Sequence, residues 1–277
     1  MDVITTVKQL RERLAHEKNV ALVPTMGNLH AGHIQLIKEV KPHTHCLVTS
    51  IFVNRLQFGP SEDFNRYPRT LENDCKYLLD AGCDVVFAPD EKEIYPTVQE
   101  YTVDPSGLQH LLEGAFRPGH FRGVATVVLK LFNMVQPQIA IFGKKDYQQY
   151  LVLKDMVTQL ALPIEIVPAE TVRAPDGLAL SSRNSYLNPT EREEAVQLYG
   201  QLMAIKKAIL AGYKDYTTLE KVATAYLNSR GWHTDYIAIR AQDHLRLTTP
   251  DETQLVVLGA SRLGKTRLID NLEIALN

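Results

Sequence analysis

Two histidines stand three residues apart in the stretch MGNLHAGH, residues 26–33. This stretch follows the apolar run NVALVPT and opens a segment whose apolar residues have helical spacing. Positions i and i+3 share one face of a helix, so His30 and His33 would lie together there. The first helical turn leaves backbone N–H groups at the positive end of the dipole, and the two glycines let the backbone approach a ligand. Together these features suit a polyphosphate.

Histidine pairs also occur in ordinary surface loops, with glycines that serve turns. H-x-G-H fixes only three letters, so the pattern alone favours that simpler interpretation. Its position after the first strand of a βα unit favours a nucleotide site, because doubly wound folds bind nucleotides there.

Two further segments carry groups that could bind phosphate. FGKKDYQQY (142–150) also follows an apolar strand and opens a helix, so Lys144, Lys145 and Gln149 would face the same crevice. Adjacent lysines at such a turn are also common as a solvated corner. LALSSRN (178–184) offers two hydroxyls and a guanidinium, which can donate to phosphate oxygens.

The apolar pattern predicts how these segments are positioned. Continuously apolar strands separated by amphipathic helices indicate a parallel sheet covered on both faces. We predict an α/β fold: a Rossmann-like doubly wound parallel sheet with a second, smaller α+β C-terminal domain. The predicted strands of the first domain are 19–25, 45–53, 84–89, 139–143 and 164–170, and its helices are 5–17, 33–40, 70–82, 123–136 and 146–160.

The alternation of apolar strands and helices ends near residue 174. This change predicts a Rossmann-like domain at 1–173 and a smaller α+β domain at 174–277. Thr190 with Glu193 predicts a capping box at the start of a helix. The other predicted elements of the smaller domain are helices over 190–211 and 217–229, and strands at 232–240, TQLVVLGA and RLIDNLEIAL.

Bulk properties narrow the function classes. The net charge of −2 gives no support to a nucleic-acid partner or an anionic membrane surface. We expect a cytoplasmic protein, because the N-terminus lacks the apolar core of a signal peptide and no stretch reaches the roughly 18–20 apolar residues of a membrane span. The three scattered cysteines fit reduced thiols better than a disulfide framework or zinc site.

The sequence resembles the pantothenate synthetase family over nearly all of its length. The matching segments are VPTMGNLHAGH, SIFVN…QF, YPRTLE, EGAFRPGHFRGV, FGKKDYQQ, DGLALSSRN and RLGKTRLIDN. The resemblance places the chain in the H-x-G-H nucleotidyltransferase superfamily. It implies an ATP-dependent ligase that joins (R)-pantoate to β-alanine through a pantoyl adenylate and releases AMP and pyrophosphate. It also implies Mg²⁺ with the ATP, an ATP- and pantoate-binding domain at 1–173, a lid domain at 174–277, and a homodimer.

The resemblance implies roles for individual residues. His33 and His30, with Lys145 and Arg183, would act in catalysis at the phosphates. Asp74 would be the candidate for the neighbourhood of Mg²⁺, and the alternative is that it is a carboxylate on the exposed face of the helix 70–82. The implied pantoate contacts are Gln57, Gln149, Asn54 and Tyr67. The implied ATP contacts are Met26, Gly27, Asn28, Leu29, His30, Ala31, Gly32, His33, Gly143, Lys144, Lys145, Asp146, Val172, Leu180, Ser181, Ser182 and Arg183.

One position departs from the family. Arg55 stands where the family has proline after the asparagine of SIFVN. Proline fixes φ and stiffens a turn, whereas arginine does neither. We expect a more mobile pocket edge near Gln57 and a raised KM for pantoate.

The stretch GASRLGKT (259–266) fits the phosphate-loop pattern G-x-x-x-x-G-K-[ST]. A working phosphate loop needs a helix after it, whereas TRLIDNLEIALN begins with strand-like alternation. We therefore interpret this segment as part of the small domain. The alternative functions are a nucleotidyltransferase of the same superfamily, an RNA-binding module and a GKT-type ATPase.

Overall fold

The computed structural model describes residues 1–60, 62–105, 107–249 and 251–276. The chain forms two compact units. The first comprises Met1–His110, Arg117–Lys144 and Gln149–Glu170, and the second comprises Leu111–Phe116, Lys145–Gln148 and Thr171–Asn277. Two short segments that precede residue 171 therefore belong to the second unit.

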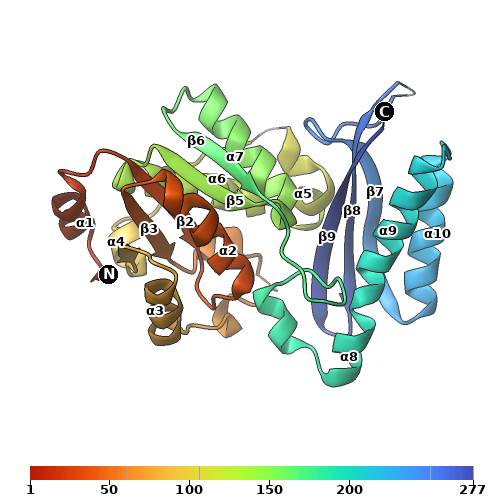
Figure 1. Cartoon of the computed structure of the whole chain (residues 1–277), viewed down its shortest axis with the longest axis horizontal. Helices are drawn as coiled ribbons and strands as arrows, with labels where there is room; N and C mark the ends of the chain where they lie inside the picture. Colours follow the sequence, from red (N-terminus) through yellow and green to blue (C-terminus); the bar gives the residue numbers. More distant parts are fainter. Residues whose placement is uncertain (61, 106, 250, 277) are drawn as a thin grey trace. The chain divides into compact units, whose positions relative to one another are not determined.

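A six-stranded parallel sheet forms the centre of the first unit (Figure 1), in the order β1-β4-β3-β2-β5-β6. The chain runs outward from β2 in both directions, so the strand order reverses at β2 and β5. Ligands of doubly wound folds bind beyond the carboxyl ends of the strands at such a switch point. The strands are β1 (Asp2–Ile4), β2 (Val20–Thr25), β3 (Cys46–Ile51), β4 (Val85–Phe87), β5 (Ile139–Gly143) and β6 (Glu165–Ala169).

Helices cover both faces of this sheet. Right-handed crossovers place α2 and α3 on one face and α1, α6 and α7 on the other, and α1 packs against α6. The core on the α2 side contains Val23, Ile37, Leu47 and Leu78, all almost completely buried. The helices are α1 (Val7–Leu14), α2 (Ala31–Val40), α3 (Leu71–Asp80), α4 (Glu91–Ile94), α6 (His120–Val135) and α7 (Tyr147–Gln159).

The second unit is an antiparallel sheet in the order β7-β8-β9, with α9 and α10 packed on one face (Figure 1). Its core is separate from that of the first unit and includes Leu202, Leu227 and Trp232. Its elements are α5 (Leu112–Phe116), α8 (Pro189–Glu194), α9 (Val196–Leu210), α10 (Tyr216–Ser229), β7 (Trp232–Ala241), β8 (Gln254–Leu263) and β9 (Thr266–Ala275).

The predicted fold class is confirmed: a doubly wound parallel sheet with a smaller α+β part. The domain division at 173/174 stays a prediction. The predicted cap at Thr190 is wrong, because Asn188 caps α8 and Glu191 closes the capping box. Within the described ranges, no helix is both long enough and apolar enough to span a bilayer.

Candidate active site

The turn after β2 is shaped by hydrogen bonds from neighbouring strand ends. The hydroxyl of Thr25 donates to the carbonyl of Ser50 at 2.7 Å and accepts the N–H of Gly27 at 3.2 Å. Gly27 and Asn28 both have positive φ, 80° and 52°. Glycine and asparagine adopt this region more easily than other residues, which explains why the chain can turn sharply here.

His30 and His33 form the first turn of α2 as the sequence predicts. His30 is the N-cap, and its Nδ1 accepts the N–H of Gly32 at 3.1 Å. The Nδ1 of His33 accepts the N–H of His30 at 3.3 Å, and the ring centroids are 4.1 Å apart. A neutral imidazole that accepts at Nδ1 must carry its proton on Nε2. Both rings are therefore held in the tautomer that donates from Nε2.

Asp74 fixes the two residues between the glycine and the histidines. Its Oδ2 accepts the N–H of Asn28 at 3.0 Å and the hydroxyl of Thr70 at 3.1 Å, while its Oδ1 accepts the N–H of Leu29 at 2.8 Å. The residue is 1% exposed, so the alternative of an exposed carboxylate on α3 is wrong. Its carboxylate orients the turn that carries the histidines.

Gln57 lies at the end of a short 3-10 helix, η2 (Arg55–Gln57), in a network of polar contacts. Its Oε1 accepts from the amide of Asn54 at 3.0 Å, and its Nε2 lies 3.2 Å from the sulfur of Met26. Asn54 is 1% exposed and also accepts the hydroxyl of Tyr95 at 2.7 Å. The amide of Gln57 is thus held by residues that follow the strand ends of β2 and β3.

The other two predicted pantoate contacts lie in the same unit. Tyr67 is buried and packs edge-on against Phe58, with ring centroids 5.9 Å apart. Gln149 is half-buried in the first turn of α7. A cavity of about 310 Å³ opens beyond the ends of β2, β3 and β4, lined in part by Met26 and Arg69.

The turn after β5 starts at the same edge of the sheet as the histidine turn, because β2 pairs with β5. Gly143 ends β5, and Lys144 follows it in the 3-10 helix η5 (Lys144–Asp146). The ammonium of Lys144 lies 2.6 Å from the carboxylate of Glu170, which follows β6. The carboxyl ends of the neighbouring strands β2 and β5 thus carry two of the predicted phosphate-binding turns.

The remaining predicted contacts belong to the second unit. The ammonium of Lys145 lies 3.6 Å from Oδ1 of Asp146. A small hairpin joins Val172 to Leu180, whose N–H donates to the carbonyl of Val172 at 2.9 Å. Ser181 caps the 3-10 helix η6 (Ser182–Tyr186) and accepts the N–H of Arg183 at 3.3 Å, so Ser181, Ser182 and Arg183 share one tight turn.

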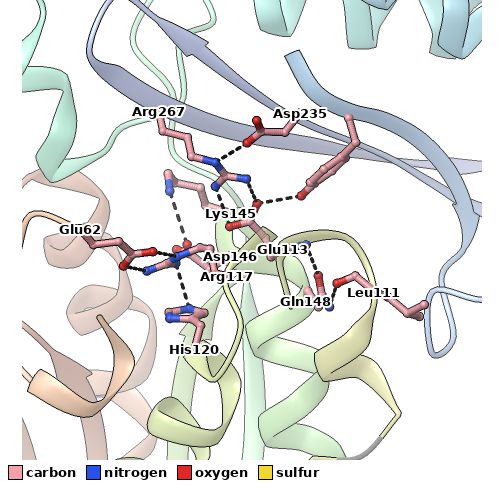
Figure 2. Close-up of polar contacts among 11 residues, drawn as sticks. Glu62, Leu111, Glu113, Arg117, His120, Lys145, Asp146, Gln148, Asp235 and Arg267 are labelled. Carbon is pink, nitrogen blue, oxygen red and sulfur yellow. Dashed lines mark hydrogen bonds and ion pairs between the residues drawn. The ribbon is translucent and has the colours of Figure 1, made fainter. Parts of the chain in front are cut away.

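Several buried and half-buried polar residues were not singled out from the sequence (Figure 2). In the second unit, both oxygens of Glu113 accept from the guanidinium of Arg267, at 2.6 and 2.9 Å. In the first unit, Arg117 donates to both oxygens of Glu62 at 2.7 Å and lies 3.0 Å from the ring of His120. Most of these residues lie in the segments EGAFRPGHFRGV and RLGKTRLIDN, but the sequence pattern did not predict which residues they contact.

The described residues do not form a preformed metal site. Among them, no group of three or more His, Cys, Asp or Glu side chains is placed to hold a metal ion. Both oxygens of Asp74 already accept hydrogen bonds that shape the histidine turn. The residues present therefore do not fit a Mg²⁺ held by the protein alone.

The stretch GASRLGKT is a β-hairpin. β8 and β9 pair up to Leu263 and Thr266, which leaves Gly264 and Lys265 as a two-residue turn. Gly264 has φ +56°, as the first central position of a type II′ turn requires. A strand follows the turn where a phosphate loop needs a helix, so the interpretation as part of the small domain is confirmed.

The fold and these turns define a doubly wound α/β protein whose strand ends present donors suited to a polyphosphate. A sequence profile described as pantoate-beta-alanine ligase matches residues 2–273. Pantothenate synthetase of Nitrosospira multiformis is 57% identical over 274 residues, which cover 99% of this chain and 98% of that protein. The chain belongs to the pantoate-beta-alanine ligase family.

Solved structures agree with this assignment. A pantothenate synthetase from Thermus thermophilus matches with a TM-score of 0.94 and 44% identity, and 100% of each chain is covered. A pantoate-beta-alanine ligase from Francisella tularensis, complexed with beta-gamma ATP and beta-alanine, matches with a TM-score of 0.84 and 35% identity. That match covers 98% of this chain and 97% of the other.

Proposed function

We propose that the protein is an AMP-forming pantoate–β-alanine ligase, which condenses (R)-pantoate with β-alanine at the expense of ATP. The observation that carries the proposal is the family match over residues 2–273, which includes every predicted site segment. The nucleotidyltransferase alternative is not favoured, because the matched relatives are ligases by name.

The reaction has two steps. In the first, a carboxylate oxygen of pantoate attacks the α-phosphorus of ATP, the bond from that phosphorus to the bridging oxygen breaks, and pyrophosphate leaves. In the second, the amine of β-alanine attacks the carbonyl carbon of the adenylate, the bond to AMP breaks, and the amine loses a proton to solvent. Adenylation is needed because an ionised carboxylate is a poor electrophile.

The first step builds negative charge on the departing pyrophosphate, and preorganised donors stabilise such charge. We assign this role to the Nε2–H groups of His30 and His33, whose tautomers are fixed by the backbone. Lys145 and Arg183 supply positive charge to the β- and γ-phosphates. The other proposed nucleotide contacts are Met26, Gly27, Asn28, Leu29, Ala31, Gly32, Gly143, Lys144, Asp146, Val172, Leu180, Ser181 and Ser182.

Neutral amides suit the pantoate side of the site. Gln57 and Gln149 can bind the hydroxyl and carboxylate of pantoate without forming an ion pair that would weaken the nucleophile. Asn54 supports Gln57 through the 3.0 Å hydrogen bond between their amides. We assign Tyr67, which is buried and packs against Phe58, to the same pantoate site.

Mg²⁺ enters the proposal as the companion of ATP, bound through phosphate oxygens and water, which is its usual mode with nucleotides. The reaction needs no metal held by the protein itself, because the carboxylate of Asp74 already accepts hydrogen bonds from the turn before the histidines. A homodimer and a cytoplasmic location complete the proposal: the family resemblance supports the first, and a reaction between dissolved small molecules suits the second.

Product analysis tests the proposal. Purified protein is incubated with ATP, Mg²⁺ and pantoate, with and without β-alanine, and the products are identified by mass spectrometry. AMP, pyrophosphate and pantothenate in the full mixture alone support the ligase, and an adenylate trapped without β-alanine supports the two-step route. ADP and phosphate, or a nucleotidylated product without an amide, would overturn it.

A further inference from the structure

Strand β9 contains the segment RLIDN, which the family resemblance left without a role. Asp270 of this segment is 5% exposed and forms a two-point ion pair with Arg173, at 2.6 and 2.9 Å. Arg173 also donates to the carbonyls of Gly177 and Asn271, both at 3.1 Å. The guanidinium thus ties β9 to the small hairpin that runs from Val172 to Leu180.

The next residue, Asn271, extends this network in the opposite direction. Its own N–H donates to Oδ1 of Asp270 at 2.7 Å, and its side-chain amide donates to the backbone carbonyl of Lys145 at 2.9 Å. Asn271 is 5% exposed. This hydrogen bond is partly buried, and the lower local dielectric strengthens it, so it helps to hold the carbonyl of Lys145 in place.

A second contact holds the same turn. The hydroxyl of Tyr147 donates to Glu273 at 2.9 Å, and the carbonyl of Glu273 accepts from Lys206 at 2.9 Å. β9 therefore holds the chain at Lys145 and again two residues later. All of these residues belong to the second unit, which explains why the short segment Lys145–Gln148 belongs to that unit.

We propose that Asn271 is a positioning residue for the adenylation step: its side-chain amide fixes the backbone of Lys145 and so aims the ammonium at the ATP phosphates. This inference rests on the proposed function, which places Lys145 on those phosphates. Through Asp270 and Arg173, the same network ties the Lys145 turn to Val172, the proposed adenine contact. β9 thus sets the position of Lys145, the proposed phosphate-binding residue, relative to Val172.

Asn271→Asp tests the role with almost no change of volume, because a carboxylate cannot donate to the carbonyl of Lys145 when ionised. A small displacement of a catalytic group can cost up to about 100-fold in rate. We expect kcat to fall and KM for ATP to rise, together by about tenfold or more in kcat/KM for ATP. The KM for pantoate should stay within about twofold, since the hydrogen bonds described for Asn271 reach none of the proposed pantoate contacts.

A matched control separates positioning from general damage. Asn228 lies in the same unit, and its Oδ1 accepts the N–H of Thr234 at 3.1 Å, so Asn228→Asp keeps the acceptor that this contact uses. The control should match the wild type in kcat and in all three KM values. If Asn271→Asp fails to give a cooperative thermal melt, Asn271→Ala replaces it, because alanine removes the amide without adding a charge.

A double-mutant cycle with Lys145→Ala decides the route of the effect. If Asn271 acts through Lys145, the loss in kcat/KM for ATP caused by the Asn271 variant should shrink to about threefold or less once the ammonium is gone. An equal loss in both backgrounds, or an equal change in the KM of every substrate, would overturn the inference. Failure of the wild type to form pantothenate would instead overturn the proposed function beneath it.

Discussion

Asp74 is the residue on which the shape of the histidine turn depends most directly. Asparagine at this position would place an amide N–H₂ against the backbone N–H of Asn28 or Leu29. We expect Asp74→Asn to lower the free energy of unfolding by about 1–3 kcal/mol, the cost of an unsatisfied buried group. We also expect it to raise KM for ATP, which a pyrophosphate-release assay measures.

The matched control for Asp74→Asn is Glu72→Gln on the same helix. The Glu72 side chain is 87% exposed and pairs with Lys76 across one helical turn, so its loss should cost little. Equal stability and equal ATP kinetics in the two variants would show that the Asp74 carboxylate does not shape the turn.

Gly123 permits the backbone of η2 to approach α6. A Cβ at this position would lie 2.2 Å from the carbonyl oxygen of Leu56 and 2.6 Å from the N–H nitrogen of Gln57. Gly123→Ala should therefore displace Gln57, raise KM for pantoate and destabilise the fold by about 1–3 kcal/mol. Steady-state kinetics and urea unfolding measure the two effects.

Gly200 offers a matched control in another helix, since its added Cβ would meet no atom of the described residues within 4 Å beyond its chain neighbours and the backbone of its own helix. Gly200→Ala should leave the pantoate KM unchanged and raise stability slightly, by about 0.5–1 kcal/mol. A pantoate KM that is the same for wild type and Gly123→Ala would contradict the proposed role of η2.

Glu62 gives the first unit a defined pH dependence. Burial raises the pKa of Glu62, but the Arg117 guanidinium outweighs it and lowers that pKa below the ordinary value of 4.5. The folded state therefore binds this proton less tightly than the unfolded state. The ion pair contributes its full stability above pH 4.5 and loses it as the pH falls through the folded pKa.

The measurement for Glu62 is urea unfolding of the wild type and Glu62→Gln between about pH 7 and about pH 3. The wild type should be more stable near neutral pH, and the difference should shrink below pH 4.5 as Glu62 takes up its proton. A difference that does not change with pH would mean that the ion pair with Arg117 makes no net contribution.

At the scale of elements, the sequence pattern located most strands because buried parallel strands are continuously apolar. β5 has the predicted bounds, Ile139–Gly143. β1, Asp2–Ile4, escaped prediction because a three-residue edge strand beside β4 has too little pattern to detect. The cap of α8 was predicted two residues too late, at Thr190. Pro189 is favoured at the first position of a helix, and this signal, which the prediction did not use, marks Asn188 as the cap.

Arg55 begins η2, at the position where the family resemblance leads us to expect proline. Its guanidinium lies 3.0 Å from Glu91 and 4.3 Å from the centroid of the Phe64 ring, so the side chain supplies contacts that oppose the mobility expected from the sequence. The backbone of Asn54, with φ −82° and ψ 109°, already suits a following proline.

Arg55→Pro should therefore fold normally and change the pantoate KM by about twofold or less, because the lost ion pair is exposed and exposed pairs contribute little. Pantoate titrations at saturating ATP measure this. A KM several times lower in the proline variant would restore the idea that arginine loosens the pocket edge.

At the scale of the whole molecule, the sequence predicted which residues present chemistry but not which residues position them. His30 and His33 could be paired from spacing alone, since they share one helical turn. The partners of Asp74 and Asn271 could not, because 45 residues separate Asp74 from Leu29 and 126 separate Asn271 from Lys145. Such contacts exist only after the chain has folded.

The two units have separate hydrophobic cores, and the only tryptophan, Trp232, lies in that of the second unit. It is 3% exposed, and its indole N–H donates to Glu194 at 3.0 Å. Tryptophan fluorescence therefore reports the unfolding of the second unit. Leu202 and Leu47, each fully buried, give matched truncations in the second and first cores.

Leu202→Ala should cost about 2–5 kcal/mol and move the fluorescence-detected transition to lower urea. Leu47→Ala should cost a similar amount in the first core and move the transition seen by far-UV circular dichroism, while the fluorescence midpoint stays near that of the wild type. If both variants shift both transitions equally, the two cores unfold as one cooperative unit.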